Sequence, residues 1–113
     1  MDNQKVLWKN VNGTKVFQLA CEKGHTKMAE ILIQNSVKFN IDLNVKYGYF
    51  EKTAFQTACH YGCSEVVEII VKKSTEFNID LNSKDKEGMT GFHLACRNDY
   101  SKIAKIMVMK SNL

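Results

Sequence analysis

The sequence predicts an all-α solenoid of stacked helix–turn–helix units, because one residue pattern occurs three times at a nearly fixed spacing. Phe17, Phe55 and Phe92 are 38 and 37 residues apart, and each begins a Phe-x-x-Ala-Cys segment. Two apolar residues follow each cysteine at ten and eleven positions. A repeat of this length is typical of stacked units that share one continuous core. We expect one domain, residues 1–113, with units at about residues 1–38, 39–76 and 77–113.

Each unit is expected to contain two helices. In the first, the Phe, Ala and Cys side chains stand at i, i+3 and i+4 and therefore share one face. In the second, Met28, Ile31 and Leu32 show the same spacing, as do the matching residues of the other units. Gly24 and Gly62 suit the left-handed conformation that ends a helix. The second helices are expected to be capped by Thr26, Ser64 and Ser101.

The residues that open and join the units resemble those of a known family. Residues 88–96 read GMTGFHLAC, which is similar to the ankyrin-repeat signature G-x-T-P-L-H-x-A-A. Residues 22–32 resemble its continuation, x-x-G-H-x-x-V-x-x-L-L, and residues 41–44 and 79–82 resemble A-D-V-N. The resemblance covers nearly the whole chain. It implies an ankyrin-repeat solenoid with β-hairpin-like loops between its units and a concave face that binds proteins.

Three features depart from the family pattern. The proline that opens the first helix is replaced in every unit, by Val16, Ala54 and Gly91. The units exceed the usual length of about 33 residues. The surplus falls at residues 36–40 and 74–78, so either the second helix or the loop after it is expected to be longer. Lys15 stands where threonine is expected, and Asp99 and Tyr100 stand where Gly-His is expected.

Both ends of the chain fall within the repeating pattern. Gly13 aligns with Gly88, inside an expected hairpin. A solenoid end normally carries a polar capping face, whereas the last helix is apolar at Ile106, Met107, Val108 and Met109. We therefore expect a part of a longer array, and a short complete protein is the alternative. The apolar residues 6–8 are flanked by lysines, so neither a signal peptide nor a membrane anchor is expected.

The four cysteines and three histidines raise the question of a metal site. Cys21, Cys59 and Cys96 share one column and are expected to be small core residues. Possible zinc ligands are Cys59, His60, Cys63, His93 and Cys96. However, no Cys-x2-Cys pair occurs, and equivalent positions of stacked helices lie roughly 10 Å apart. We expect no metal, cofactor or disulfide, and reduced thiols as in a cytoplasmic or nuclear protein.

No catalytic motif accompanies these residues. Cys59 and His60 are adjacent, which on a helix directs the two side chains apart. Neither a glycine-rich phosphate loop nor a nucleophile elbow occurs in the sequence. The resemblance implies that His93, like Gln18 and Gln56 in the same column, bonds backbone groups of the neighbouring hairpin. We therefore expect no enzyme activity.

The formal net charge is +4, and Arg97 is the single arginine among sixteen basic residues. Several lysines are expected on the polar sides of the second helices: Lys72, Lys73, Lys102, Lys105 and Lys110. A solvated face explains them, and contact with nucleic acid or acidic lipid is the alternative. Arginine is the usual reader of guanine, so a chain with a single arginine is not expected to bind nucleic acid. No membrane partner is expected either, because no apolar window approaches a membrane-spanning length.

The resemblance implies a binding face formed by the hairpin tips and the exposed sides of the first helices. The candidate contacts are Asn12, Thr14, Glu22 and Lys23 in the first unit, Tyr49, Phe50, Lys52, His60 and Tyr61 in the second, and Lys86, Glu87, Met89, Arg97 and Asn98 in the third. The second set is distinctive, because with Tyr47 it gathers four aromatic residues at or near one hairpin. Exposed aromatic residues beside polar groups are typical of binding hot spots. The alternative is that these rings pack on the adjacent hairpin.

These observations predict an intracellular, non-catalytic module that binds an unidentified protein partner. Tyr49, Phe50 and Tyr61 are its predicted anchor. The alternative is a structural spacer, or a repeat segment that self-associates end to end through Val108 and Met109.

Overall fold

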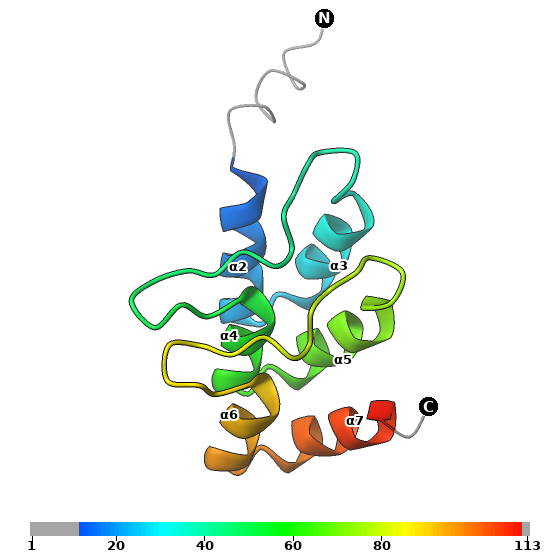
Figure 1. Cartoon of the computed structure of the whole chain (residues 1–113). Coiled ribbons are helices and arrows are strands. Elements are labelled where there is room, and N and C mark those ends of the chain that lie inside the picture. The colour runs from blue at the N-terminus through cyan, green and yellow to red at the C-terminus, as the bar shows by residue number, and fades with distance from the viewer. Residues whose placement is uncertain (1–11, 112–113) are drawn as a thin grey trace, which may run out of the picture.

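The computed structural model describes residues 12–111, which form six helices in three pairs. The first helices are α2 (Gly13–Lys23), α4 (Ala54–His60) and α6 (Gly91–Arg97), and the second helices are α3 (Thr26–Gln34), α5 (Ser64–Lys73) and α7 (Ser101–Ser111). Figure 1 shows α2, α4 and α6 stacked in one column and α3, α5 and α7 in the adjacent column. This is the predicted all-α solenoid. No helix in residues 12–111 has both the length and the apolar character needed to cross a membrane.

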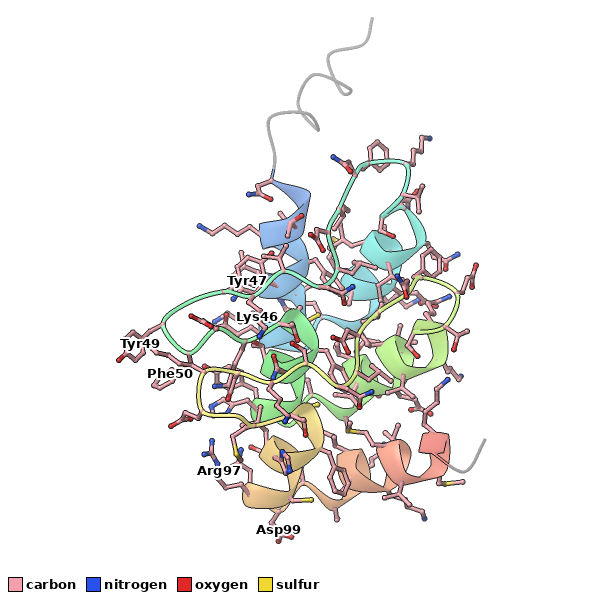
Figure 2. All side chains as sticks on the ribbon, viewed as in Figure 1. Lys46, Tyr47, Tyr49, Phe50, Arg97 and Asp99 are labelled. Carbon is pink, nitrogen blue, oxygen red and sulfur yellow. The ribbon has the colours of Figure 1, made fainter. Side chains whose placement is uncertain are left out.

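Two long loops join the pairs and project beyond the first helices (Figure 1). No β-strand forms among residues 12–111, but Tyr47 and Lys52 make an isolated antiparallel bridge in the loop between α3 and α4. This joining loop is therefore hairpin-like, as expected. Tyr49 and Phe50 lie at its tip (Figure 2).

The starts of α4 and α6 are fixed by capping boxes. The hydroxyl of Thr53 accepts from the backbone N–H of Gln56, and the Gln56 side chain accepts from the backbone N–H of Thr53. Thr90 and His93 form the same reciprocal pair in the third unit. Each box satisfies two backbone donors that a helix leaves unpaired at its start.

The start of α2 differs because Lys15 occupies the column of the capping threonine. Asn12 caps the helix instead, accepting from the backbone N–H of Lys15 at 3.1 Å. The helix consequently begins at Gly13, three positions earlier than the aligned start of α4. The expectation that Gly13 lies in a hairpin is wrong.

The predicted caps of the second helices are displaced by one residue. Thr26, Ser64 and Ser101 are the first helical residues, not the caps. His25 and Cys63 hold the cap positions of α3 and α5 and make no side-chain capping bond. Gly24 and Gly62 do adopt the predicted left-handed conformation, with φ of 73° and 74°. The backbone turn itself therefore starts the second helix, and no cap side chain is required.

The surplus residues of the long units lie in the loops after the second helices. α3 ends at Gln34 and α5 ends at Lys73, so the helices are not extended. The Ser36 hydroxyl donates to the carbonyl of Ile33 at 2.7 Å, and Ser74 makes the corresponding bond at 2.8 Å. An asparagine in left-handed conformation ends each turn, at Asn40 and Asn78. Of the two possibilities left by the sequence, the longer exit loop is the one observed.

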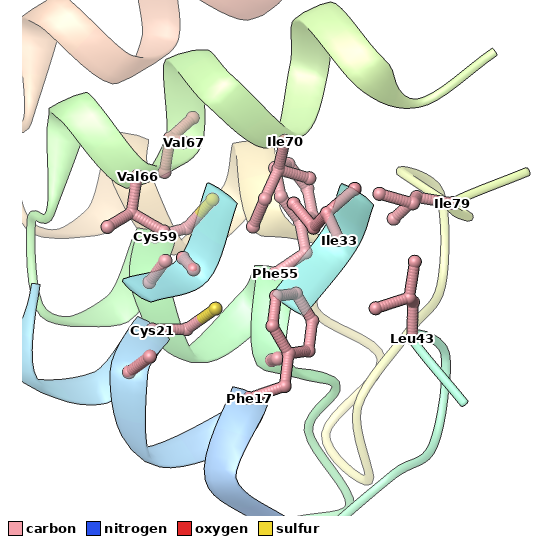
Figure 3. Packing of buried hydrophobic residues seen from close by; sticks show 14 of the residues in the cluster. Phe17, Cys21, Ile33, Leu43, Phe55, Cys59, Val66, Val67, Ile70 and Ile79 are labelled. Carbon is pink, nitrogen blue, oxygen red and sulfur yellow. The ribbon is translucent and has the colours of Figure 1, made fainter. Parts of the chain in front are cut away.

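The core is a set of repeated columns. Figure 3 shows the rings of Phe17 and Phe55 one above the other, with the thiols of Cys21 and Cys59 beside them. All four side chains are buried. Cys96, predicted to be a core residue in the same column, is exposed. The reason is that α6 belongs to the last pair of the described stack, so no further pair covers that side of it (Figure 1).

The contact between α4 and α6 explains one departure from the family pattern. A Cβ atom at Gly91 would lie 2.7 Å from Phe55 Cε2 and 2.9 Å from Cys59 Sγ. These distances are shorter than a side-chain carbon can tolerate. Glycine in place of proline therefore allows the third unit to approach the second closely.

Side chains from one unit also bind the backbone of the next. Gln56 Nε2 donates to the carbonyls of Ser83 and Met89, both at 2.9 Å, as the family resemblance implied, whereas His93 in the same column accepts from the backbone N–H of Thr90 in its own unit. Asn44 donates to the Asn78 carbonyl and accepts from the backbone N–H of Asp80. These bonds fix the joining loops relative to the helices and so determine the shape of the surface between them.

Candidate functional site

A groove of about 470 Å³ lies where the joining loops meet the first helices. It is lined by Gln18, Glu22, Tyr47, Gly48, Tyr49, Phe50, Lys52, Thr57, His60, Tyr61, Glu87 and Arg97. Most of the predicted contacts, from all three units, are therefore brought to one groove. Six others lie outside its lining: Asn12, Thr14, Lys23, Lys86, Met89 and Asn98.

The four aromatic residues of the second unit have different roles. Tyr47 is half-buried, and its hydroxyl donates to the backbone carbonyl of Thr14 in α2 at 2.8 Å. Tyr47 therefore ties the joining loop to the first unit. Tyr49, Phe50 and Tyr61 are exposed. The alternative that these rings pack within the stack applies to Tyr47, whereas the other three remain accessible.

The tip of the loop is held by contacts among two aromatic rings and two ammonium groups. Tyr49 and Phe50 meet edge to face, with ring centroids 5.1 Å apart. Lys86 Nζ lies 3.9 Å from the centroid of Tyr49, and Lys52 Nζ lies 4.9 Å from that of Phe50. The backbone N–H of Lys86 also donates to the Phe50 carbonyl at 2.7 Å. The second joining loop thus holds the aromatic tip of the first in one arrangement.

Asp85 connects the two joining loops from a buried position. Its side chain is fully buried, and one carboxylate oxygen lies 3.1 Å from Lys52 Nζ. The other oxygen accepts from the backbone N–H groups of Glu87 and Met89, both at 2.9 Å. Sequence reasoning missed this residue. The available signal was the Asp-x-x-Gly turn of residues 85–88, in which aspartate accepts backbone bonds a few residues on.

The charge of Asp85 is stabilised by these partners. Burial alone would raise the pKa of its carboxyl group. The bonds from Met89, Lys52 and Glu87 outweigh that effect, so the pKa lies below the usual value of 3.8. At neutral pH the pair is therefore ionic, and the charge of Lys52 is compensated before any ligand enters the groove.

His60 forms part of the groove lining on α4. Its ring meets that of Tyr61 edge to face, with centroids 4.9 Å apart. Burial, followed by the positive charges of Lys52 and Arg97, lowers the pKa of His60 below 6.5. The imidazole is therefore neutral at pH 7, and its Nδ1 atom is buried without a hydrogen-bond partner. Its position is more enclosed than the sequence predicted.

Several predicted contacts have structural partners instead. Asn12 caps α2, and the Thr14 hydroxyl accepts from the backbone N–H of Asp42 at 3.1 Å. Met89 is half-buried against the core. Asn98 ends α6, and its side chain donates to the carbonyl of His60 at 3.3 Å. The groove instead includes Gln18 and Thr57, polar residues of the first helices that were not predicted as contacts.

The possible zinc ligands are not brought together. Within residues 12–111, no group of three or more His, Cys, Asp or Glu side chains could hold a metal ion. All four cysteines carry free thiols. Burial, with a smaller effect of Cys63, raises the pKa of Cys21 to about 12, and burial also raises that of Cys59. Both groups behave as core residues, because a thiol with so high a pKa is a poor metal ligand or nucleophile.

Comparison with known proteins agrees with this architecture. A family model described as ankyrin repeats, in three copies, matches residues 2–80 and 36–113. Among curated proteins, none matches the chain. Ankyrin repeats generally mediate protein–protein interaction and are typically non-catalytic. With matches that together extend over nearly its whole length, the chain belongs to the ankyrin-repeat family.

Proposed function

We propose that this chain is a non-catalytic protein-interaction module whose groove receives a segment of a partner protein. The observation that carries the proposal is the exposure of Tyr49, Phe50 and Tyr61 around one groove that all three units line. Large rings that are accessible but rigidly placed are the commonest anchors of protein interfaces. The joining loops are held by the Asp85 bonds and by Lys86, so binding would require little further ordering.

The side chains of the groove favour an apolar anchor on the partner. Lys52 is paired with Asp85, and the carboxylates of Glu22 and Glu87 face a single further cation, Arg97. The groove therefore has little net charge to steer a strongly charged ligand. An aliphatic or aromatic side chain placed between the rings would gain most, with Gln18 and Thr57 available to bond the backbone of the partner segment.

The remaining parts of the proposal follow from the family and the thiols. We infer an intracellular location, because ankyrin-repeat proteins are often intracellular and free cysteines are typical of reducing compartments. We assign no cofactor and no catalytic step to the groove, in keeping with the typical character of the family. A protein is the proposed partner, not nucleic acid, because the lysines of the second helices lie apart from the groove lining.

The test compares the parent chain with a Tyr49→Ala/Phe50→Ala/Tyr61→Ala variant in pull-downs from a cell lysate, followed by titration of the purified partner. A Val37→Ala/Phe39→Ala variant is the matched control, because these exposed apolar residues lie on the exit loop outside the groove lining. Circular dichroism and urea unfolding establish that all three proteins fold.

We expect the triple variant to bind the partner at least about thirtyfold more weakly, since one hot-spot residue contributes about 2 kcal/mol or more. We expect the control variant to bind as the parent does. Raising the salt concentration from about 50 mM to about 500 mM should change the affinity less than about threefold, because little net charge is involved. Equal binding by the parent and a folded triple variant would refute the proposed site.

A further inference from the structure

Three side chains at equivalent positions form one column along the groove. Glu22 is the next-to-last residue of α2, and His60 and Arg97 are the last residues of α4 and α6. All three line the groove. The first helices are stacked (Figure 1), so the three side chains follow one another in chain order along it. We call Glu22, His60 and Arg97 the charge column.

The charge of this column changes from unit to unit. Glu22 is negative and Arg97 is positive at neutral pH. His60 between them is neutral at pH 7, because burial and the nearby cations hold its pKa below 6.5. The charge column is therefore negative on the first unit, neutral on the second and positive on the third.

The two charged residues of the column have no partner within residues 12–111. Neither the carboxylate of Glu22 nor the guanidinium of Arg97 makes an ion pair or a side-chain hydrogen bond there. Lys52, another cation of the groove, differs because it is paired with Asp85 at 3.1 Å. Glu22 and Arg97 therefore have their full hydrogen-bonding capacity available for a ligand.

Glu87 also lines the groove but does not belong to the charge column. It lies on the joining loop before α6, next in sequence to Lys86, whose ammonium group lies 3.9 Å from the centroid of the Tyr49 ring. A carboxylate and an ammonium group are thus neighbours at the loop tips, whereas the opposite charges of the column stand on different units.

The spacing of the column determines the length of a ligand that could reach both charges. Packed helices lie about 8–10 Å apart, so α2 and α6, with α4 between them, are about 16–20 Å from each other. An extended chain advances about 3.3 Å per residue, so residues about five or six positions apart span this distance. The exposed rings of Tyr49, Phe50 and Tyr61 belong to the middle unit, so an apolar anchor would lie between the two charged residues of the ligand.

We propose that the groove recognises an extended segment with a basic residue at one end, an acidic residue about five or six positions away, and an apolar anchor between them. The basic residue pairs with Glu22, and the acidic residue pairs with Arg97, whose guanidinium fits a carboxylate in bidentate geometry. The inference rests on the proposed function of the groove and adds the chemistry of its ligand. Because the two pairs are of opposite sign, they fix the position of the segment without requiring that it carry a net charge.

The test uses short peptides selected on the parent chain from a displayed random library. The tightest binder is synthesised with its two charged residues as one lysine and one glutamate (the mixed form), as two lysines, and as two glutamates. A further mixed form carries the two charges at adjacent positions. Dissociation constants are measured by fluorescence titration at about 50 mM salt, where screening is weak.

Two variants reverse the charges of the column one at a time. Glu22→Arg leaves two cations in it, and Arg97→Glu leaves two carboxylates. Glu68→Arg and Lys105→Glu are the matched controls, because they change the net charge equally at exposed positions of α5 and α7 outside the groove lining. Urea unfolding establishes that each variant is folded. Glu22→Gln or Arg97→Gln replaces a reversal that does not fold, and should abolish discrimination at that end.

We expect the parent to bind the mixed form about fivefold more tightly than either like-charged form, since each of these loses one ion pair and gains one repulsion. Glu22→Arg should prefer the form with two glutamates, and Arg97→Glu the form with two lysines, whichever way the segment runs. Both controls should keep the preference of the parent. The mixed form with adjacent charges should bind about threefold more weakly, because it cannot span the column.

Several results would overturn the proposal and leave the groove intact. They are selected peptides without oppositely charged residues, a preference that neither reversal changes, and an equal change of preference in the controls, which would show that net charge decides. Peptides that bind the Tyr49→Ala/Phe50→Ala/Tyr61→Ala variant as tightly as the parent would instead refute the groove itself, and this inference with it. A selection that yields no binder would do the same.

Discussion

Asp85→Ala is expected to destabilise the protein more than any other single change to the joining loops. The carboxylate is fully buried, accepts two backbone bonds at 2.9 Å and pairs with Lys52 at 3.1 Å. Lys52 is itself only 14% exposed. The substitution therefore leaves two backbone N–H groups and one ammonium group without their acceptor.

The magnitude follows from these contacts. A hydrogen bond to a charged group contributes about 1.5–3 kcal/mol. Removal of one partner from a buried ion pair costs about 3–5 kcal/mol. The two figures overlap, because the same desolvated groups enter both, so we expect a loss of about 3–5 kcal/mol in the free energy of unfolding. Single domains are stable by only about 5–15 kcal/mol, so the expected loss is a large part of the total free energy of unfolding.

Asp80→Ala provides a matched control. Asp80 accepts one backbone bond, from Asn82 at 2.8 Å, but is exposed. Its removal should cost about 0.5–1.5 kcal/mol. Urea unfolding followed by circular dichroism at pH 7 measures both variants. The double variant Lys52→Met/Asp85→Ala should recover part of the loss, because it removes the unpaired ammonium group together with its partner.

The pH dependence supplies an independent check. The folded pKa of Asp85 is lower than the unfolded one, so the charged group stabilises the fold above about pH 3.8. This contribution is lost as the pH falls through the folded pKa, and Asp85→Ala should remove that part of the acid sensitivity. A loss at pH 7 no larger than that of Asp80→Ala would refute the reasoning, because burial and pairing would then contribute nothing.

Three further predictions concern other elements. Gly62→Ala should lower the free energy of unfolding by at least about 2 kcal/mol, because the φ of Gly62 is +74° and a Cβ atom would lie 2.8 Å from the Tyr100 ring. Gly48 has a similar φ but open space around it, so Gly48→Ala should lower the free energy by about half as much. Urea unfolding measures both variants. Iodoacetamide should label Cys96 before the other cysteines, because Cys96 is the most exposed of the four. Mass spectrometry of timed samples follows the labelling, and earlier labelling of a buried thiol would contradict this order. The free energy of unfolding should decrease as the pH falls below 6.5, because the pKa of His60 is lower in the folded than in the unfolded chain, so the unfolded chain binds the proton first. His60→Asn should make this decrease smaller. If the pH profile of the variant equals that of the parent, His60 is not its cause.

The helices could be predicted from the sequence because the residue pattern that forms them is local and occurs three times. The spacing of Phe17, Phe55 and Phe92 identified the units, and glycines such as Gly24 identified the turns. The start of α2 could not be read from the repeat, because Lys15 removes the capping threonine and a different residue caps the helix. The burial of Cys96 was predicted wrongly for another reason. A column predicts burial only where a neighbouring unit covers it.

The groove was predicted less completely, since it depends on contacts between loops that are far apart in sequence. Tyr49 and Phe50 were found because four aromatic residues gather at or near one hairpin in the sequence. The separate role of Tyr47 depends on its bond to Thr14, 33 residues away, and could not be inferred from residue type. Asp85 was missed because its pairing with Lys52 becomes evident only when both loops are placed.

Comparison of the three units with one another explains why the groove can be specific. Three core columns of the first helices hold the same residue in each unit, phenylalanine, alanine or cysteine, because every unit must fit the next. The groove column of Glu22, His60 and Arg97 holds a different residue in each unit. Stacking does not constrain these positions, so each can take a residue suited to a ligand. The proposed aromatic anchor lies on the middle unit, which has a neighbour on both sides, so the stack supports the proposed binding residues from both directions.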